Sequence, residues 1–269
     1  MKDLLTAITR KQTHEKHAAA DGNKTIIIKA ITTDVLVIAV CVLPILQDLE
    51  VEKLWVAFGQ GQNLKWIPIY DISPSIGPEK SKSLLFFHAF TGCDVVSAFR
   101  GKGKKSAWQT WNVCPEASTV FFYRKLSQYP PVIGEDDQSI LEKFVVTMHD
   151  RFSATDSTDV ARLELFARKQ RSYDSILPTQ AALIQHIKRA AYQAGYIWGQ
   201  ATICQMETKS PAYWGWKKQY DMWQMFWTVL PPIAQSCQQL TKSGCKTEFC
   251  GRCKCYCFSL PSIALCSCN

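Results

Sequence analysis

Hydrophobic and polar positions in the first hundred residues predict a mixture of strands and helices. The β-branched run "TIIIKA" (25–30) predicts a strand, whereas "TDVLVIAVCVL" (33–43) is apolar all round and fits a buried helix or a second strand. "KLWVAFG" and "LKWIPIYDI" predict two short strands, and the "GQGQN" between them supplies the turn of a hairpin. "GPEKSKSLLFFHAF" (77–90) predicts a helix with Pro78 and Glu79 in its first turn.

The chain from 104 to about 195 is mostly helical by its pattern. The segments "SILEKFVVTMHDRF", "TDVARLELFARKQR" and "TQAALIQHIKRAAYQAG" place apolar residues three and four positions apart, with Asp137, Thr158 and Thr179 as candidate caps. Residues 196–232 are rich in tryptophan, and "SPAYWGW" predicts a loop. We interpret the tryptophans as rings that close a core over this loop, with base stacking by an exposed ring as the alternative.

Composition narrows the class of protein. The chain has 269 residues, of which 47% are hydrophobic and 20% charged, with a net charge of +8 that favours acidic partners such as nucleic acid. The longest apolar run (35–46) is too short to span a bilayer and contains Pro44, and the N-terminus "MKDLLTAITR" lacks the features of a secretion signal. We therefore expect no membrane association and an intracellular, nuclear protein.

Cysteines concentrate at the end of the chain. Eight of the 12 cysteines lie from Cys237 onward, and without a secretion signal metal ligation is the stronger interpretation. Thiolates suit zinc, four to an ion, so about two zinc ions could be bound. The expected zinc ligands are Cys245, Cys250, Cys253, Cys255, Cys257, Cys266 and Cys268. The alternative is a disordered, reduced tail.

Candidate chemistry centres on "TGCDVVSAFRGKGKKSAW" (91–108). Asp94 follows one apolar segment and Asp34 another, and carboxylates at the ends of such elements can meet at one rim of an open α/β sheet. A cap on the following helix is the alternative for Asp34. The bend after Asp94 carries no acid, and glycines at alternating positions let backbone amides face a phosphate. Its expected nucleic-acid contacts are Arg100, Gly101, Lys102, Gly103, Lys104 and Lys105, and a solvated surface turn is the alternative.

"FTGCDVVSAFRGKGKKSA" resembles the junction in flap endonucleases and related PIN-like 5′-nucleases, where a metal-binding aspartate leads into a glycine- and lysine-containing turn. "TTDVLVIA" resembles the Asp-x-Asp segment of that superfamily, and "LWVAFGQGQNLKWIPIYDI" its intervening hairpin, so the similarity covers roughly residues 24–112. The chain is also similar to multi-copy animal proteins with "DTDVVVLA", "FHAFTGCDT" and "GKGKKTAW". That likeness extends through the tryptophan segment into the cysteine tail, and "GRCKCYCF" resembles part of the CXC-type cysteine-rich modules of DNA-binding and chromatin proteins.

The resemblance implies a nuclease in which Asp34 and Asp94, with Glu15, hold Mg²⁺ or Mn²⁺ beside a scissile phosphate. The chain departs from the pattern at two places. Thr32 replaces the first aspartate of the Asp-x-Asp segment, and "THEKHAAADG" replaces an acidic motif ahead of the strand. Asp34 and Asp94, with Glu15 or Asp71, are equipped for one magnesium ion rather than two.

The fold class expected is therefore α/β. It comprises a PIN/FEN-like sheet with helices (1–112), a helical and tryptophan-rich extension (113–235), and a cysteine-rich zinc module (236–269). The expected function is that of a magnesium-dependent, structure-specific nuclease with weakened catalysis that contacts the DNA backbone. The alternative is a non-catalytic DNA- or RNA-binding relic of a mobile-element protein. A third class, an enzyme with Cys93 as nucleophile, lacks any histidine tied to it by a recognised pattern.

Overall fold

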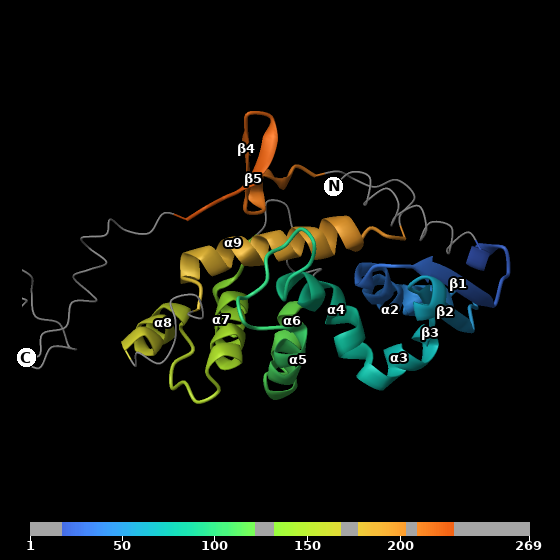
Figure 1. Cartoon of the computed structure of the whole chain (residues 1–269), viewed down its shortest axis with the longest axis horizontal. Coiled ribbons are helices and arrows are strands. Elements are labelled where there is room, and N and C mark those ends of the chain that lie inside the picture. The colour runs from blue at the N-terminus through green and yellow to red at the C-terminus, as the bar shows by residue number, and fades with distance from the viewer. Residues whose placement is uncertain (1–17, 122–131, 168–176, 203–208, 229–269) are drawn as a thin grey trace, which may run out of the picture. The chain divides into compact units, whose positions relative to one another are not determined.

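The structure is a computed structural model that describes residues 18–121, 132–167, 177–202 and 209–228 (Figure 1). Glu15 and all seven cysteines expected to bind zinc lie outside these ranges. The chain divides into two compact units, residues 1–226 and residues 227–269. The boundary expected at 112/113 lies inside the first unit, at the end of a helix. Among the described residues, no helix has both the length and the apolar character that crossing a membrane requires.

The first part of the described chain contains a three-stranded sheet with the order β1-β2-β3 (Figure 1). Strand β1 (Thr25–Ala30) pairs in parallel with β2 (Lys53–Phe58), and β2 pairs antiparallel with β3 (Lys65–Pro68). The 3-10 turn Gly61–Asn63 joins β2 to β3, so the predicted strand and hairpin are confirmed. Ile26 and Ile28 lie opposite Leu54 and Val56 and are buried with them, because paired residues share a face of the sheet.

The apolar segment after β1 is a helix, α2 (Thr33–Gln47). It is the crossover that a parallel strand pair requires, which decides between the helix and strand interpretations of this segment. Pro44 lies within α2, and the helix continues beyond it to Gln47. Asp34 in the first turn is favourable there, because the N-terminal end of a helix carries partial positive charge.

Two helices follow the sheet. The predicted strand over 64–72 is too long, because β3 ends at Pro68 and α3 (Ile69–Ile76) begins at once. Helix α4 (Pro78–Phe90) has Pro78 and Glu79 in its first turn, as predicted. Its phenylalanines pack with Phe121 of α6 and with Trp111 of α5, which makes α4 the centre of the core.

The following region is helical, as predicted, and the mixed α/β class is confirmed. The helices are α5 (Lys104–Val113), α6 (Ala117–Phe121), α7 (Glu135–His149), α8 (Thr158–Ala167) and α9 (Gln180–Ala191), the last continuing as a π-helix (Tyr192–Trp198). Thr179 caps α9, since its hydroxyl accepts a hydrogen bond from the Ala182 N–H. Asp137, a candidate cap, instead lies inside the first turn of α7, which begins after Gly134.

The tryptophan-rich segment forms an antiparallel hairpin that the sequence pattern did not predict. Strands β4 (Trp216–Gln219) and β5 (Met222–Met225) follow a short 3-10 turn (Pro211–Tyr213). Trp198 and Trp214 are buried, as expected for rings that close a core. Trp223 is partly exposed, so the core interpretation does not apply to every ring in this segment.

Candidate functional site

Asp34 lies at the carboxyl end of β1, where α2 begins. The residue is buried, with 7% of its surface exposed. Its Oδ1 is 2.8 Å from His88 Nε2, on α4. The pair therefore ties the start of α2 to α4 across the core.

His88 is a helical histidine whose sequence pattern favours a packed or surface residue over a ligand, and it is packed. It is buried between apolar neighbours on α4, and its ring lies 5.5 Å from that of Trp198. The available signal was one polar side chain within the apolar run "LLFFHAF", because a buried polar group needs a hydrogen-bonding partner. The sequence could not say that the partner was Asp34, 54 residues earlier.

Asp94 has a different environment. It is exposed, in the segment between α4 and α5. That segment is shaped by Gly92, whose φ is +107° and whose position would bring an added Cβ to 2.5 Å from Ala98 Cβ. The Cys93 N–H donates to the Val96 carbonyl oxygen and closes a turn around Asp94. We call residues 88–105 the α4–α5 junction.

The basic bend forms the end of this junction. Gly101 adopts a φ of +70°, and the Lys102 N–H donates to the Phe99 carbonyl oxygen. Gly103 precedes the first residue of α5, and no side chain caps that end of the helix. Arg100, Lys104 and Lys105 are exposed, and Lys102 is half-buried. The bend therefore places cationic side chains next to backbone amides of a helix N-terminus.

Lys104 turns back into the junction. Its Nζ donates to the carbonyl oxygens of His88 (2.9 Å) and Gly92 (2.6 Å) and to Thr91 Oγ1 (3.0 Å). Burial lowers the pKa of Lys104 to about 8, although the charges of Cys93 and Asp34 act in the opposite direction. All three protons of the ammonium group have partners within the chain. We interpret Lys104 as a positioning residue that closes the C-terminal end of α4 onto the start of α5.

Cys93 is half-buried in the same junction. Burial raises the pKa of its thiol, the nearby Asp34 raises it further, and Lys104 opposes the shift. A raised pKa leaves less of the reactive thiolate. This environment does not favour a nucleophilic role for Cys93.

His186, from α9, reaches the same junction. Its Nε2 lies 2.7 Å from the Phe90 carbonyl oxygen, and its Nδ1 lies 3.3 Å from Ser97 Oγ. A carbonyl oxygen can only accept, so Nε2 carries the proton and Nδ1 accepts from the serine hydroxyl. Burial lowers the pKa of His186 to about 4, so the ring is neutral near pH 7. His186 therefore joins α9 to the junction as a neutral group.

The described residues contain no group of three or more acidic, histidine or cysteine side chains close enough to hold a metal ion. One oxygen of Asp34 is engaged by His88, Asp94 is exposed, and Asp71 lies exposed in the first turn of α3. Magnesium prefers an octahedral set of oxygens. The described donors alone do not supply that set, and Glu15, the third expected ligand, lies outside them.

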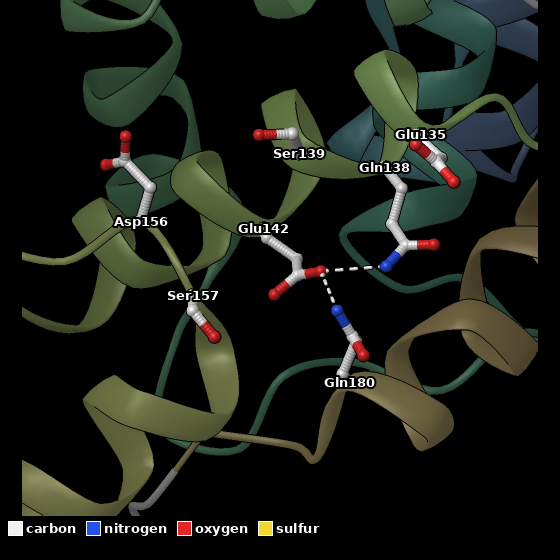
Figure 2. A pocket seen from close by; sticks show the side chains of 7 residues that line it. All are labelled: Glu135, Gln138, Ser139, Glu142, Asp156, Ser157 and Gln180. Carbon is white, nitrogen blue, oxygen red and sulfur yellow. Dashed lines mark hydrogen bonds between the residues drawn. The ribbon is translucent and has the colours of Figure 1, made fainter.

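A second polar site lies between α7, α8 and α9. An open pocket of about 450 Å³ lies there, and its lining includes Glu135, Asp156 and the buried Glu142. Figure 2 shows the side chains that line it. Glu142 Oε1 accepts from the side-chain amides of Gln138 (2.9 Å) and Gln180 (2.7 Å), which are the dashed lines in Figure 2.

The other oxygen of Glu142 accepts hydrogen bonds from the start of α8. Glu142 Oε2 accepts from the Thr158 N–H and hydroxyl, both at 3.0 Å. Burial acts to raise the pKa of Glu142, but these hydrogen bonds and those from the two glutamines outweigh it and hold that pKa below its usual value. Both oxygens are used to join three helices, so we interpret Glu142 as structural.

Comparison of the chain with protein-family models, with curated proteins and with solved structures gives no match.

Proposed function

We propose that this protein binds nucleic acid through its sugar–phosphate backbone at the α4–α5 junction, and that it hydrolyses the bound strand weakly or not at all. The observation that carries the proposal is the exposed basic bend at the uncapped start of α5. The segment from Val95 to Val113 has no acidic residue. The whole chain carries a net charge of +8. Phosphate contacts of this kind position a duplex without reading its sequence.

The backbone of the bend supports the same proposal. The first amides of a helix have no partner within the helix, and the partial positive charge at this end favours an anion. Because no side chain caps α5, these amides can hydrogen-bond to a phosphate while Arg100, Lys102 and Lys105 neutralise it. Lys104 contributes by fixing the bend to α4 rather than by reaching the ligand.

Binding is favoured over hydrolysis by the state of the carboxylates. A two-metal phosphodiesterase clamps the attacking and the leaving oxygen with two ions about 4 Å apart. Among the described residues, Asp34 is buried against His88, Asp94 is exposed, and no group of three or more acidic, histidine or cysteine side chains could hold a metal ion. A magnesium-dependent nuclease that uses Asp34, Asp94 and Glu15 remains the alternative. Magnesium-dependent cleavage of flapped duplexes that Asp94→Ala abolishes would favour that alternative.

A salt titration of duplex binding tests the phosphate contact. Each phosphate neutralised on B-DNA contributes about −0.9 to the slope of log affinity against log salt. We expect the double variant Lys102→Ala/Lys105→Ala to make the slope shallower by about 2, because two contacts are lost. Lys53→Ala/Lys65→Ala, which removes two exposed lysines from strands of the sheet, is the matched control and should leave the slope unchanged. Equal slopes for the two double variants would contradict the proposal.

We further propose that the cysteine-rich tail binds zinc, with Cys245, Cys250, Cys253, Cys255, Cys257, Cys266 and Cys268 as ligands. The support is the number and close spacing of these cysteines in the sequence. All seven lie outside the described ranges, so the support comes from the sequence alone. Elemental analysis of the purified chain should find about two zinc ions per molecule, because each ion takes four thiolates with some shared. Cys253→Ser/Cys255→Ser should lower that number, whereas Cys41→Ser, which removes a thiol packed near α4, should not.

A further inference from the structure

The hairpin β4–β5 is anchored at its base. Trp214, just before it, is fully buried. The Gly215 carbonyl oxygen accepts from the Phe226 N–H (2.8 Å) and from Arg189 Nη1 on α9 (3.3 Å). This joins both ends of the hairpin to the buried core, so the base of the hairpin has a defined position.

The turn of the hairpin presents an exposed ring. Tyr220 and Asp221 form the two-residue connection, and both have positive φ values, 48° and 59°. Such turns usually take glycine or asparagine, because the left-handed conformation is unfavourable for other residues. Lys218 Nζ lies 2.7 Å from Asp221 Oδ1 in an exposed ion pair across the turn. Tyr220 is 87% exposed, so an unfavourable backbone carries a ring that packs little against the protein.

Rings and positive charge occur together along this segment. Between residues 209 and 226 the chain has three lysines, one aspartate and no arginine. The large apolar side chains exposed there are Tyr213, Tyr220, Met222, Trp223 and Phe226. The strand register places Lys218 directly opposite Trp223, so a cation and a ring are neighbours on one face.

We propose that the hairpin β4–β5 is a second nucleic-acid site, which stacks unpaired bases on Tyr220 and Trp223 while Lys218, opposite Trp223, attracts the adjacent phosphate. Every nucleobase has a face that can stack on an aromatic ring, so this recognition requires single-stranded nucleic acid and tolerates any sequence. A duplex hides those faces, and the basic bend of the α4–α5 junction needs only phosphates. Duplex binding therefore reports on the bend alone, whereas a single strand can use both sites.

Charge and polarity favour this ligand over the two other surfaces that aromatic side chains contact. The hairpin tip carries Gln219 and Asp221, and insertion into a bilayer would strip these groups of water. Protein–protein interfaces are depleted of lysine at their centres and enriched in arginine, which this segment lacks. An excess of lysine beside exposed rings instead complements a polyanion whose bases are free.

The test is fluorescence anisotropy of a labelled 20-nucleotide oligothymidine with the full-length protein. Tyr220→Asn removes the ring and keeps a residue that tolerates positive φ, and Trp223→Gln removes the second ring from an exposed strand position. We expect each variant to bind the oligonucleotide about tenfold more weakly, the scale of one lost stacking contact. Phe152→Ala is the matched control, because Phe152 is 94% exposed on the segment between α7 and α8 and should contribute nothing.

Two further measurements make the outcomes decisive. In the Lys102→Ala/Lys105→Ala background, Tyr220→Asn should still weaken oligothymidine binding about tenfold, whereas the duplex binding of that background is less salt-dependent. If only the salt dependence of duplex binding changes as expected, the hairpin proposal fails and the bend proposal stands. If only the hairpin variants lose affinity for oligothymidine, the bend proposal fails and the hairpin proposal stands. Unchanged oligothymidine binding by Tyr220→Asn and Trp223→Gln would overturn the hairpin proposal. The proposal would also be overturned if the wild type bound vesicles of anionic phospholipid, and if both variants lost that binding but kept their affinity for oligothymidine.

Discussion

The α4–α5 junction and the hairpin β4–β5 use polar and aromatic side chains in opposite ways. In the junction, Lys104 and His186 direct their polar atoms toward carbonyl oxygens and hydroxyls of the chain. In the hairpin, Tyr220 is mostly in solvent and Trp223 is partly exposed. Lys104, which the glycine–lysine motif predicts as a ligand contact, thus serves partly to hold the chain together. Tyr220 and Trp223, which belong to no motif, remain accessible to a ligand.

The difference teaches how a charged side chain should be weighed. Burying a polar group without a partner is costly, so a lysine that enters the protein must find acceptors there. Lys104 stays exposed, but its ammonium group already has three acceptors within the chain, so it is less available to a phosphate than Lys105. Sequence spacing alone treats Lys104 and Lys105 as equivalent, whereas their environments differ.

The largest effect is expected at Asp34. Asp34→Ala leaves His88 buried without its partner, and we expect the free energy of unfolding to fall by about 3 kcal/mol. Asp94→Ala is the matched control and should change it by less than about 0.5 kcal/mol, because Asp94 is exposed. Urea denaturation followed by circular dichroism measures both. Similar losses for the two variants would break the distinction between buried and exposed carboxylates.

An acid titration sharpens the comparison through His186. Its pKa in the folded protein is lowered to about 4, below the ordinary 6.5, so the unfolded chain binds the proton more strongly between these values. Stability is fully present above pH 6.5 and is lost as pH falls toward 4, by about 2 kcal/mol at pH 5. His186→Gln should lack this part of the acid dependence. A variant whose stability falls with pH as steeply as that of the wild type would contradict the assignment.

A pair of glycine substitutions tests how tightly the junction is built. At Gly92 an added Cβ would lie 2.5 Å from Ala98 Cβ and 2.8 Å from Ala98 Cα, whereas at Gly101 it meets open space. Both positions have positive φ, so both alanine variants bear the backbone cost. We expect Gly92→Ala to lower the free energy of unfolding by about 1.5 kcal/mol more than Gly101→Ala, because only Gly92 adds a steric clash. Equal losses would mean that the backbone at Ala98 yields freely.

The smallest effect is expected in the hairpin. Tyr220→Gly relieves a non-glycine residue at a φ of 48° and removes a ring that is mostly exposed. We expect the free energy of unfolding to rise by up to about 1 kcal/mol, since relief of the backbone outweighs the added freedom of the unfolded chain. Thermal unfolding should show an unchanged or higher midpoint. A clear decrease would indicate that Tyr220 packs against the fold, and would weaken the proposed role in stacking.

Prediction from sequence succeeds here where a local pattern has one structural solution. "TIIIKA" and the "GQGQN" turn became a strand and a hairpin connection, and Thr179 became a cap. It failed at the end of β3, where alternating apolar residues continued into α3 beyond Pro68. The hairpin β4–β5 was missed because its turn has neither glycine nor asparagine, the residues that normally mark a two-residue connection.

The sequence by itself determined the mixed α/β class, the position of Asp34 at the end of the first strand, and the excess of positive charge that favours an anionic partner. Only the tertiary structure decided which polar groups have partners inside the protein. It brought His88 to Asp34 and turned Lys104 back onto α4, and it left Tyr220 in solvent. The physical reason is that strand and helix patterns depend on near neighbours in the sequence. Whether a polar atom is satisfied depends on residues brought close by folding, in this case from as far as 96 positions away.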